Sequence, residues 1–218
     1  MSEVLLEVTR GPLVENIHRG DIAVVGRDGK LKYYKGDPYK VAYLRSSLKP
    51  IQALNVFLSG AVEKYNFEDD EIALMCSSHY GEDMHRAVVD KILNKIGLNE
   101  SNLLCKGAYS INEKYKNFQL ENHIKLTSAN SDCSGKHCGM LASCLAKGYD
   151  IENYNSIDNP LQQDLKKLIA HICEIDESKI IIGTDGCGVP VHVMPLYNAA
   201  LAFSKFTFTD DLQHELKS

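Results

Sequence analysis

The chain contains 218 residues, 44% of which are hydrophobic, and carries a formal net charge of −5. Its lysine and arginine residues are scattered, so no basic face predicts nucleic-acid binding. No stretch approaches the about 20 apolar residues of a membrane-spanning helix. The first residues lack the basic and apolar segments of a secretory signal, which predicts a cytoplasmic protein. The seven cysteines, an odd number, are therefore expected to be free thiols, metal ligands or reactive groups.

The N-terminal part predicts β-structure. Residues 3–9 and 20–26 are rich in strand-forming side chains. The Asp-Gly turn of "RDGK" (27–30) leads into the strand "LKYYK", so residues 20–35 are expected to form a β-hairpin.

The middle of the chain predicts helices around one strand. Apolar residues at helical spacing follow the stretch 44–52. The segment "IALMCSSHYGE" (72–82) is expected to be a short buried strand that runs into a polar loop. An amphipathic helix follows at 82–96, with Gly97 as its C-cap. Residues 98–135 show no clear pattern.

The remaining chain continues the alternation. Further helices are expected at 136–147, from Pro160 to about Cys173, and at 195–204. The segment "KIIIGTDGCGVP" (179–190) predicts a buried strand that ends in a glycine-rich loop, and "TFTDDLQHELKS" (207–218) predicts the start of a last helix. Because strands and helices alternate after an initial hairpin, we expect an α/β (α+β) fold, a mixed β-sheet with flanking helices. No linker divides the chain.

The stretch "LRSSLKPIQ" (44–52) places Ser46 three residues before Lys49. Residues three apart share a helix face, so the lysine can reach the serine hydroxyl and activate it as a nucleophile. S-x-x-K alone is common by chance, and the alternative is a solvated helix cap.

The stretch "MCSSHYGE" (75–82) places polar residues directly after the expected strand. Ser78 and His79 are candidates for proton relay or substrate binding, since such loops often carry ligand-binding groups. The alternative is a turn in which both side chains satisfy backbone groups.

Two cysteine-containing loops complete the set of candidates. In "SDCSGKHCGM" (131–140), Cys133, Lys136, His137 and Cys138 crowd a turn before a helix, although the spacing matches no common zinc signature. In "GTDGCGVPVH" (183–192), Cys187 lies between glycines that allow the backbone to approach a ligand. A structural cysteine and a tight turn with a chance thiol are the alternatives.

Taken together and in this order, these stretches resemble the L-asparaginase II family, the Rhizobium-type thermolabile asparaginases. The matching segments are "GPLVENIHRGDIAVV" (11–25), "LRSSLKPIQAL" (44–54), "CSSHYGE" (76–82), "CSGKHCGML" (133–141) and "GTDGCGVPVHVMPL" (183–196). The resemblance implies hydrolysis of L-asparagine to L-aspartate and ammonia. It also implies a fold similar to serine β-lactamases, penicillin-binding proteins and glutaminases, and a homodimer.

The resemblance also implies roles for single residues. Ser46 is the expected nucleophile, Lys49 its base, and Ser78 a second active-site serine. The family's zinc site matches Cys133, Lys136 and Cys187, and zinc there is expected to support substrate binding rather than to activate the nucleophile. Asp185 is expected to orient a ligand or the substrate. We add that Arg45 is placed to hold the substrate carboxylate.

Two departures from the family pattern bear on these expectations. Cys138 stands where the family more often has alanine, so an additional thiol is expected to compete for the metal. No glycine-flanked lysine follows Ser204, whereas such a lysine in the family pairs with the second serine. The chain is therefore expected to be one asparaginase II domain, 1–218, truncated at its C-terminus.

Two other functions remain open from the sequence. The first is a catalytically inactive relic that still binds zinc or substrate. The second is a related amide or β-lactam acyl-transferase that shares the S-x-x-K element, which the cysteine-containing loops make the less favoured of the two.

Overall fold

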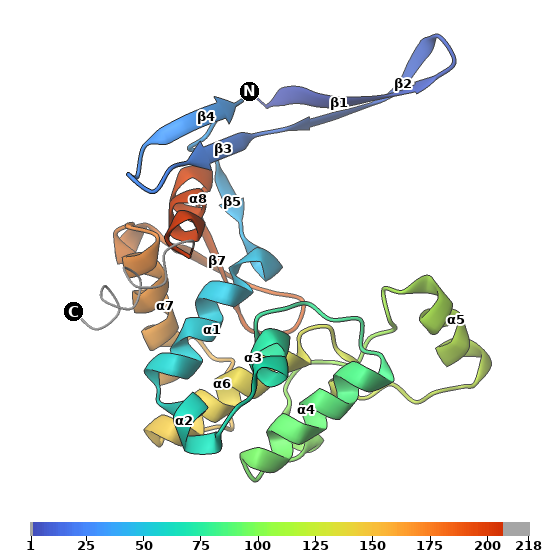
Figure 1. The fold of residues 1–218 in the computed structure, drawn as a ribbon, viewed down its shortest axis with the longest axis vertical. Helices are drawn as coiled ribbons and strands as arrows, with labels where there is room; N and C mark the ends of the chain where they lie inside the picture. Colours follow the sequence, from blue (N-terminus) through green and yellow to red (C-terminus); the bar gives the residue numbers. More distant parts are fainter. Residues whose placement is uncertain (1, 207–218) are drawn as a thin grey trace. The chain divides into compact units, whose positions relative to one another are not determined.

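The computed structural model describes residues 2–206, and the helix expected at 207–218 lies outside this range. Of the described residues, 2–44, 170–181 and 192–206 form one compact unit, and 45–169 with 182–191 form a second (Figure 1). All nine candidate site residues lie in the second unit. No helix between residues 2 and 206 combines the length and the apolar character needed to cross a lipid bilayer.

The first unit begins with two antiparallel hairpins. Strand β1 (Glu3–Arg10) pairs with β2 (Leu13–Gly20), and β3 (Ile22–Val25) pairs with β4 (Leu31–Lys35). The predicted hairpin at 20–35 is confirmed, whereas β2 was not expected. Gly11, between β1 and β2, has φ +59°, a conformation that glycine adopts without steric cost.

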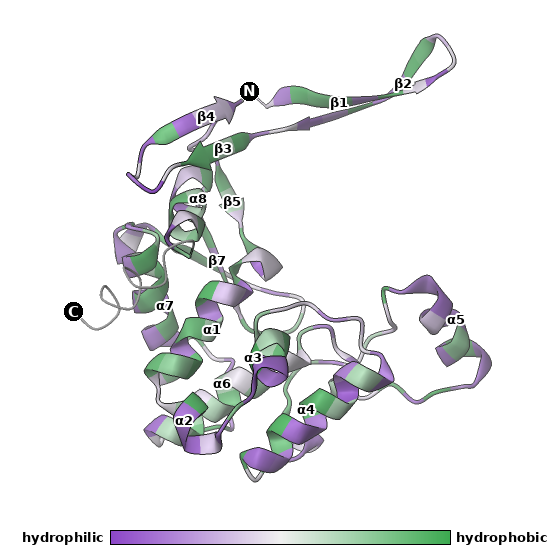
Figure 2. Ribbon diagram, viewed as in Figure 1, coloured by the Kyte–Doolittle hydropathy of each residue, from purple (hydrophilic) through white to green (hydrophobic). Residues whose placement is uncertain are grey.

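One helix covers the second hairpin. Helix α8 (Leu196–Lys205) packs against β3, whose four residues are all hydrophobic (Figure 2). The hydroxyl of Tyr197 in α8 donates to the backbone oxygen of Gly29 at 2.6 Å, which fixes the helix to the turn of this hairpin.

The remaining strands form a three-stranded sheet in the order β5-β7-β6. Its strands are β5 (Val41–Tyr43), β6 (Ile181–Thr184) and β7 (Pro190–Pro195). Strands β5 and β7 are antiparallel, with Ala42 opposite Met194. The expected combination of β-sheet and helices is confirmed, but the described strands form three small sheets rather than one. Strand β6 is only half-buried, with Ile181 exposed, which corrects the expectation of a buried strand.

The second unit is mainly helical, and its centre is α6 (Ser134–Lys147), of which every residue from Ser134 to Cys144 is buried. Helix α6 contacts several neighbouring helices, which are α1 (Lys49–Leu58), α2 (Ala61–Tyr65), α3 (Asp69–Met75) and α4 (Asp83–Lys95). Further helices of this unit are α5 (Glu113–Glu121) and most of α7 (Pro160–Ile172). The helices predicted at 82–96, 136–147 and 160–173 are therefore confirmed within a few residues.

Helix α3 corrects the prediction of a strand at the start of "IALMCSSHYGE". The carboxylate of Glu71 accepts the backbone N–H of Glu68 at 2.6 Å, which makes a capping box, and acidic residues in the first turn favour the N-terminal end of a helix. Glu71 is fully buried and also accepts a hydrogen bond from Lys95 Nζ at 2.7 Å. The polar loop that carries Ser78 thus follows a helix and not a strand.

A glycine allows α3 and α6 to approach closely. A Cβ atom on Gly135 would overlap the carbonyl oxygen of Leu74, near the end of α3. The same oxygen accepts the backbone N–H and the hydroxyl of Ser77, each at 3.3 Å. The last turn of α3 and the first turn of α6 are therefore in direct backbone contact beside the loop that carries Ser78.

Candidate functional site

Lys49 lies at the centre of the candidate site. It is the first residue of α1, follows the 3-10 turn Arg45–Leu48, and is fully buried. Its Nζ donates to the hydroxyl of Ser78 at 2.8 Å, to the backbone oxygen of Ser77 at 3.0 Å and to that of Asp132 at 3.2 Å. An ammonium group has three N–H donors, so this geometry satisfies all of them. The sequence does not predict the two carbonyl groups as partners of Lys49, because a backbone acceptor gives no residue-specific signal.

The two candidate serines differ in their relation to this lysine. Ser78 is exposed and bonded to Lys49, whereas Ser46 is exposed and has no hydrogen-bond partner within residues 2–206. Ser46 belongs to the 3-10 turn while Lys49 begins the α-helix. In the described residues no hydrogen bond joins the hydroxyl of Ser46 to the amine of Lys49. The structure brings Lys49 to Ser78 and not, by any hydrogen bond, to Ser46.

His79 is buried, with 3% of its surface exposed, and both ring nitrogens are used. The backbone N–H of Gly81 donates to Nδ1 at 3.1 Å, so the proton lies on Nε2, which is 2.9 Å from the hydroxyl of Ser134. Ser134 in turn donates to the backbone oxygen of Ala129 at 3.2 Å. This chain of hydrogen bonds ties the Ser78 loop to the start of α6 and leaves neither ring nitrogen for a substrate.

Burial of His79 makes the stability of the protein depend on pH. Burial, together with the nearby charges of His85 and Lys49, lowers its pKa from 6.5 to about 4. Between these values the unfolded state binds more protons, so the free energy of unfolding should fall by roughly 2–3 kcal/mol as the pH decreases from about 7 to about 4. Urea unfolding at several pH values checks this. In His79→Gln, which cannot titrate, this part of the pH dependence should be absent, and an equal dependence in both proteins would contradict the prediction.

A second group of side chains surrounds the sulfur of Cys187. Lys136 Nζ, from the first turn of α6, donates to Cys187 Sγ at 3.1 Å. A hydrogen bond from Cys133, another from His137 and the charge of Lys136 lower the pKa of Cys187, while the bond to Cys187 and burial raise the pKa of Cys133. Cys187 is therefore the thiolate of the pair. The three residues that the family pattern assigns to zinc are brought together.

Asp185 links this group to the 3-10 turn. Its Oδ1 accepts from Arg45 Nε at 3.3 Å, and its Oδ2 lies 3.9 Å from Lys136 Nζ. Arg45 has φ +45°, an uncommon conformation for a residue with a side chain. The turn with Ser46 is thus tied by an ion pair to the loop with Cys187.

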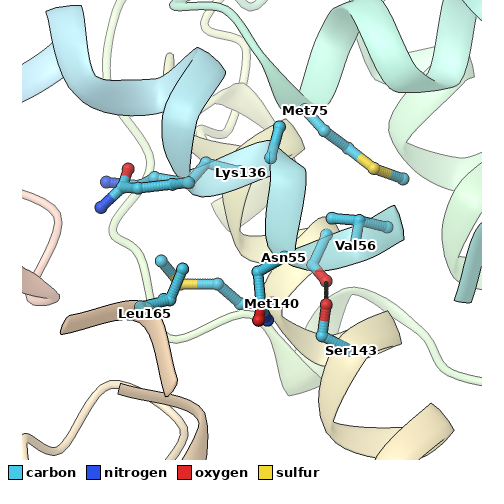
Figure 3. Close-up of a pocket in the computed structure, with 10 residues that line it drawn as sticks. Asn55, Val56, Met75, Lys136, Met140, Ser143 and Leu165 are labelled. Carbon is cyan, nitrogen blue, oxygen red and sulfur yellow. Dashed lines mark hydrogen bonds between the residues drawn. The ribbon is translucent and has the colours of Figure 1, made fainter. Parts of the chain in front are cut away.

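A pocket of about 10 Å³ lies beside Lys136, between α1, α3, α6 and α7 (Figure 3). Among its lining residues, Gln52 Oε1 and Asn55 Nδ2 are buried and have no hydrogen-bond partner in the described part of the chain. The volume matches about one water molecule, so this pocket is too small for an amino-acid substrate.

Two other groups do not belong to the site. Cys138 is fully buried in the hydrophobic core, and burial raises its pKa; its surroundings do not support the expected competition for a metal. Within residues 2–206, Glu68, Asp70 and Glu71 alone place three His, Cys, Asp or Glu ligand atoms within 4.8 Å of one another. Lys91 and Lys95 pair with these carboxylates at 2.7 Å or slightly more, so the cluster forms an ion-pair network.

The chain matches a known protein family. A family model described as L-asparaginase II matches residues 6–217, nearly the whole chain. No curated protein matches the chain.

Proposed function

Because the chain belongs to the L-asparaginase II family, we propose that it hydrolyses L-asparagine to L-aspartate and ammonia through a serine ester. Membership of the family supports an amidohydrolase that acts on asparagine. One observation carries the mechanistic part: a fully buried lysine amine lies 2.8 Å from an exposed serine hydroxyl. An accessible hydroxyl with an adjacent base is the arrangement that activates serine as a nucleophile.

The hydrogen bonds of Lys49 suit a base. In its neutral form the amine has two N–H groups and one lone pair. The carbonyl oxygens of Ser77 and Asp132 can accept the two N–H groups, which leaves the lone pair for the hydroxyl proton of Ser78. Two fixed acceptors thus orient the amine toward the hydroxyl that it is to deprotonate.

The proposed reaction has two steps. The serine oxygen attacks the side-chain amide carbon of asparagine, and Lys49 takes the hydroxyl proton. Collapse of the tetrahedral intermediate forms a β-aspartyl ester and transfers that proton to the departing ammonia. Water then attacks the ester, Lys49 takes a proton from it and returns the proton to the serine oxygen, and aspartate leaves.

Two serines compete for the role of nucleophile. The S-x-x-K pattern assigns it to Ser46, and the hydrogen bond to Lys49 favours Ser78. Arg45 keeps N–H donors beyond those that Asp185 accepts, since a guanidinium has five, and its side chain is 67% exposed. We therefore retain Arg45 as the group that binds the substrate carboxylate and Asp185 as the residue that orients it.

We also propose that Cys133, Lys136 and Cys187 hold zinc. Thiolate sulfur is a preferred zinc ligand, and the amine of Lys136 lies 3.1 Å from the sulfur of Cys187, which suits two ligands of one ion. Bound zinc would supply positive charge that supports binding of the substrate. Lysine must lose a proton to act as a ligand. In the structure, an N–H group of Lys136 donates to the sulfur of Cys187.

Three further expectations stay predictions: the fold of serine β-lactamases, the homodimer and the cytoplasmic location. Each derives from the resemblance or from composition.

Ammonia release from L-asparagine tests the proposed function. We expect the chain to release ammonia. Replacement of the serine that is the nucleophile, in Ser46→Ala or Ser78→Ala, should lower the rate of ammonia release by at least about a thousandfold. Mass spectrometry after acid quenching should find an aspartyl adduct on that serine alone. Ser101→Ala, which removes an exposed hydroxyl that donates to the side chain of Asn99, is the matched control.

Two outcomes would count against the proposal. Full activity in both serine variants would exclude the serine ester. A folded, zinc-loaded protein that releases no ammonia would favour the inactive zinc-binding relic instead.

A further inference from the structure

Residues 107–127, which carry α5, leave and rejoin the rest of the second unit at one point (Figure 1). A Cβ atom on Gly107 would overlap the backbone of Thr127, so the two ends of this excursion are in direct backbone contact. Its buried residues are the polar Ser110 and Gln119, joined by a hydrogen bond from the backbone N–H of Ser110 to Gln119 Oε1 at 3.0 Å. Large apolar side chains are exposed instead, namely Tyr109, Ile111, Phe118 and Leu120. The shape of the excursion therefore depends on polar contacts.

Two side chains of the excursion bind the first residues of α4. Asn112 Nδ2 donates to Glu82 Oε1 at 2.7 Å, and the hydroxyl of Tyr115 donates to Asp83 Oδ1 at 2.7 Å. Glu82 is the N-cap residue of α4 but makes no side-chain cap bond, so its carboxylate serves Asn112 and not its own helix. Asn112 Oδ1 accepts the backbone N–H of Lys114 at 3.2 Å and so caps α5, which leaves the amide nitrogen to donate to Glu82.

The neck of the excursion holds the residue before Glu82. Gly81 has φ +65°, and a Cβ atom there would overlap the backbone oxygen of Asn130. The buried side chain of Asn130 accepts the backbone N–H of Thr127 at 2.9 Å and donates to the backbone oxygen of Gly81 at 3.4 Å. The three consecutive residues 81–83 are therefore held from the neck and from α5 together.

These three residues end the loop that carries Ser78. The backbone N–H of Gly81 donates to His79 Nδ1 at 3.1 Å, and that of His79 donates to the backbone oxygen of Asp132 at 3.2 Å. The same oxygen accepts a hydrogen bond from Lys49 Nζ. The position of Gly81 therefore affects the orientation of the Ser78 hydroxyl toward the lysine amine.

We propose that Asn112 and Tyr115 are positioning residues for Ser78: they clamp the start of α4 and hold the loop in the geometry in which Lys49 contacts the serine. The inference rests on the proposed function, because it assigns the clamp a part in that reaction. Asn112 and Tyr115 act through the carboxylates at the start of α4 and not on the serine itself. A misplacement of about 1 Å at a reacting group can lower a rate by about a hundredfold, so remote hydrogen bonds of this kind matter for the reaction.

The variant Asn112→Asp separates the clamp from the helix cap. Aspartate caps a helix as well as asparagine does, but it has no N–H to donate and places a second carboxylate beside Glu82. In the full chain we expect kcat for ammonia release from L-asparagine to fall about tenfold, with KM changed by less than about twofold. Asn117→Asp makes the same substitution at an exposed position of α5 and should keep the normal kcat. Urea unfolding establishes that each variant is folded in the assay.

A second substitution reverses the donor and the acceptor of this bond. In Asn112→Asp combined with Glu82→Gln, the glutamine amide donates to the aspartate, and most of the lost kcat should return. Tyr115→Phe removes only the hydroxyl and should lower kcat about threefold. A normal kcat in Asn112→Asp, or a folded double variant without recovery, would overturn the proposal. If Asn112→Asp does not fold, Tyr115→Phe decides in its place, and a normal kcat there would overturn the proposal.

Hydrogen exchange without substrate makes the two proposals fail separately. In Asn112→Asp, backbone amides of residues 76–82 should exchange about tenfold faster than in the unmodified protein and in Asn117→Asp, because the loop opens locally more often. Unchanged exchange would overturn the clamp even if kcat falls. If the unmodified protein releases no ammonia, the proposed function is wrong, and the exchange of residues 76–82 still decides whether the clamp holds the loop.

Discussion

Replacement of Lys49 by alanine is expected to lower the rate of asparagine hydrolysis by at least about a thousandfold, because it removes the proposed base from the serine nucleophile. The amine is fully buried and bonded to the Ser78 hydroxyl at 2.8 Å, so water cannot take its place with the same orientation. Steady-state ammonia release at saturating asparagine measures the loss. Since alanine leaves a cavity at this position, a small alkylamine should restore part of the activity.

Stability must be separated from catalysis in this variant. Lys49→Ala also leaves the oxygens of Ser77 and Asp132 without their donor, at a cost of about 1–3 kcal/mol for each buried group, so urea unfolding accompanies the assay. Lys64→Ala is the matched control, since Lys64 donates to the backbone oxygen of Leu145 at 3.1 Å. If Lys49→Ala stays folded and hydrolyses asparagine at the normal rate, Lys49 is not the base.

Replacement of Glu71 by alanine is expected to reduce the free energy of unfolding by about 2–4 kcal/mol, because it removes a buried carboxylate that both pairs with Lys95 and caps α3. Glu71 is fully buried, pairs with Lys95 at 2.7 Å and caps α3 through the N–H of Glu68. Urea unfolding at neutral pH measures the change.

Two comparison variants sharpen the test of Glu71. Asp70→Ala removes a half-exposed carboxylate of the same network and should cost less than about 1 kcal/mol. The double variant Glu71→Leu with Lys95→Met removes both charges and should recover a large part of the loss. A loss below about 1 kcal/mol in Glu71→Ala would show that the buried pair and the cap contribute little.

Local signals predicted the longer helices and the hairpin of β3 and β4, but not the short helices α2 and α3, helix α5 or strand β2. The helix predicted at 82–96 has an apolar period and a glycine at its end; the C-cap of α4 is Ile96, and Gly97, directly after it, has φ +72°. The short apolar run in α3 was assigned to a strand because apolar runs of this length fit either structure, and the acidic capping box decided for a helix. Strand β5 pairs with residues 193–195, far along the chain. Its three residues give no local signal that predicts such a distant partner.

The candidate residues can be picked out in the sequence, but the contacts between them cannot. Ser46, Ser78, Lys49 and the cysteines stand in recognisable motifs, but the pairing of Lys49 with Ser78 depends on where α3 ends relative to α1. The sequence does not tell that Cys138 is buried in the hydrophobic core, because a cysteine beside a motif can equally face the site. Tyr154 belongs to no recognisable motif. A single tyrosine in a loop gives no sign that its hydroxyl lies 2.6 Å from Nδ1 of the buried His137.

The contact of Gly135 with Leu74 fixes both parts of the candidate site to one point of the backbone. The Leu74 oxygen that allows no side chain at position 135 also binds Ser77, so the loop with Ser78 is anchored at the same point as the turn that presents Cys133 and Lys136. Movement of the serine relative to the cysteines would require α3 and α6 to separate. If the proposed reaction takes place, the two groups should therefore keep their mutual distance through it, because that distance is fixed when the chain folds.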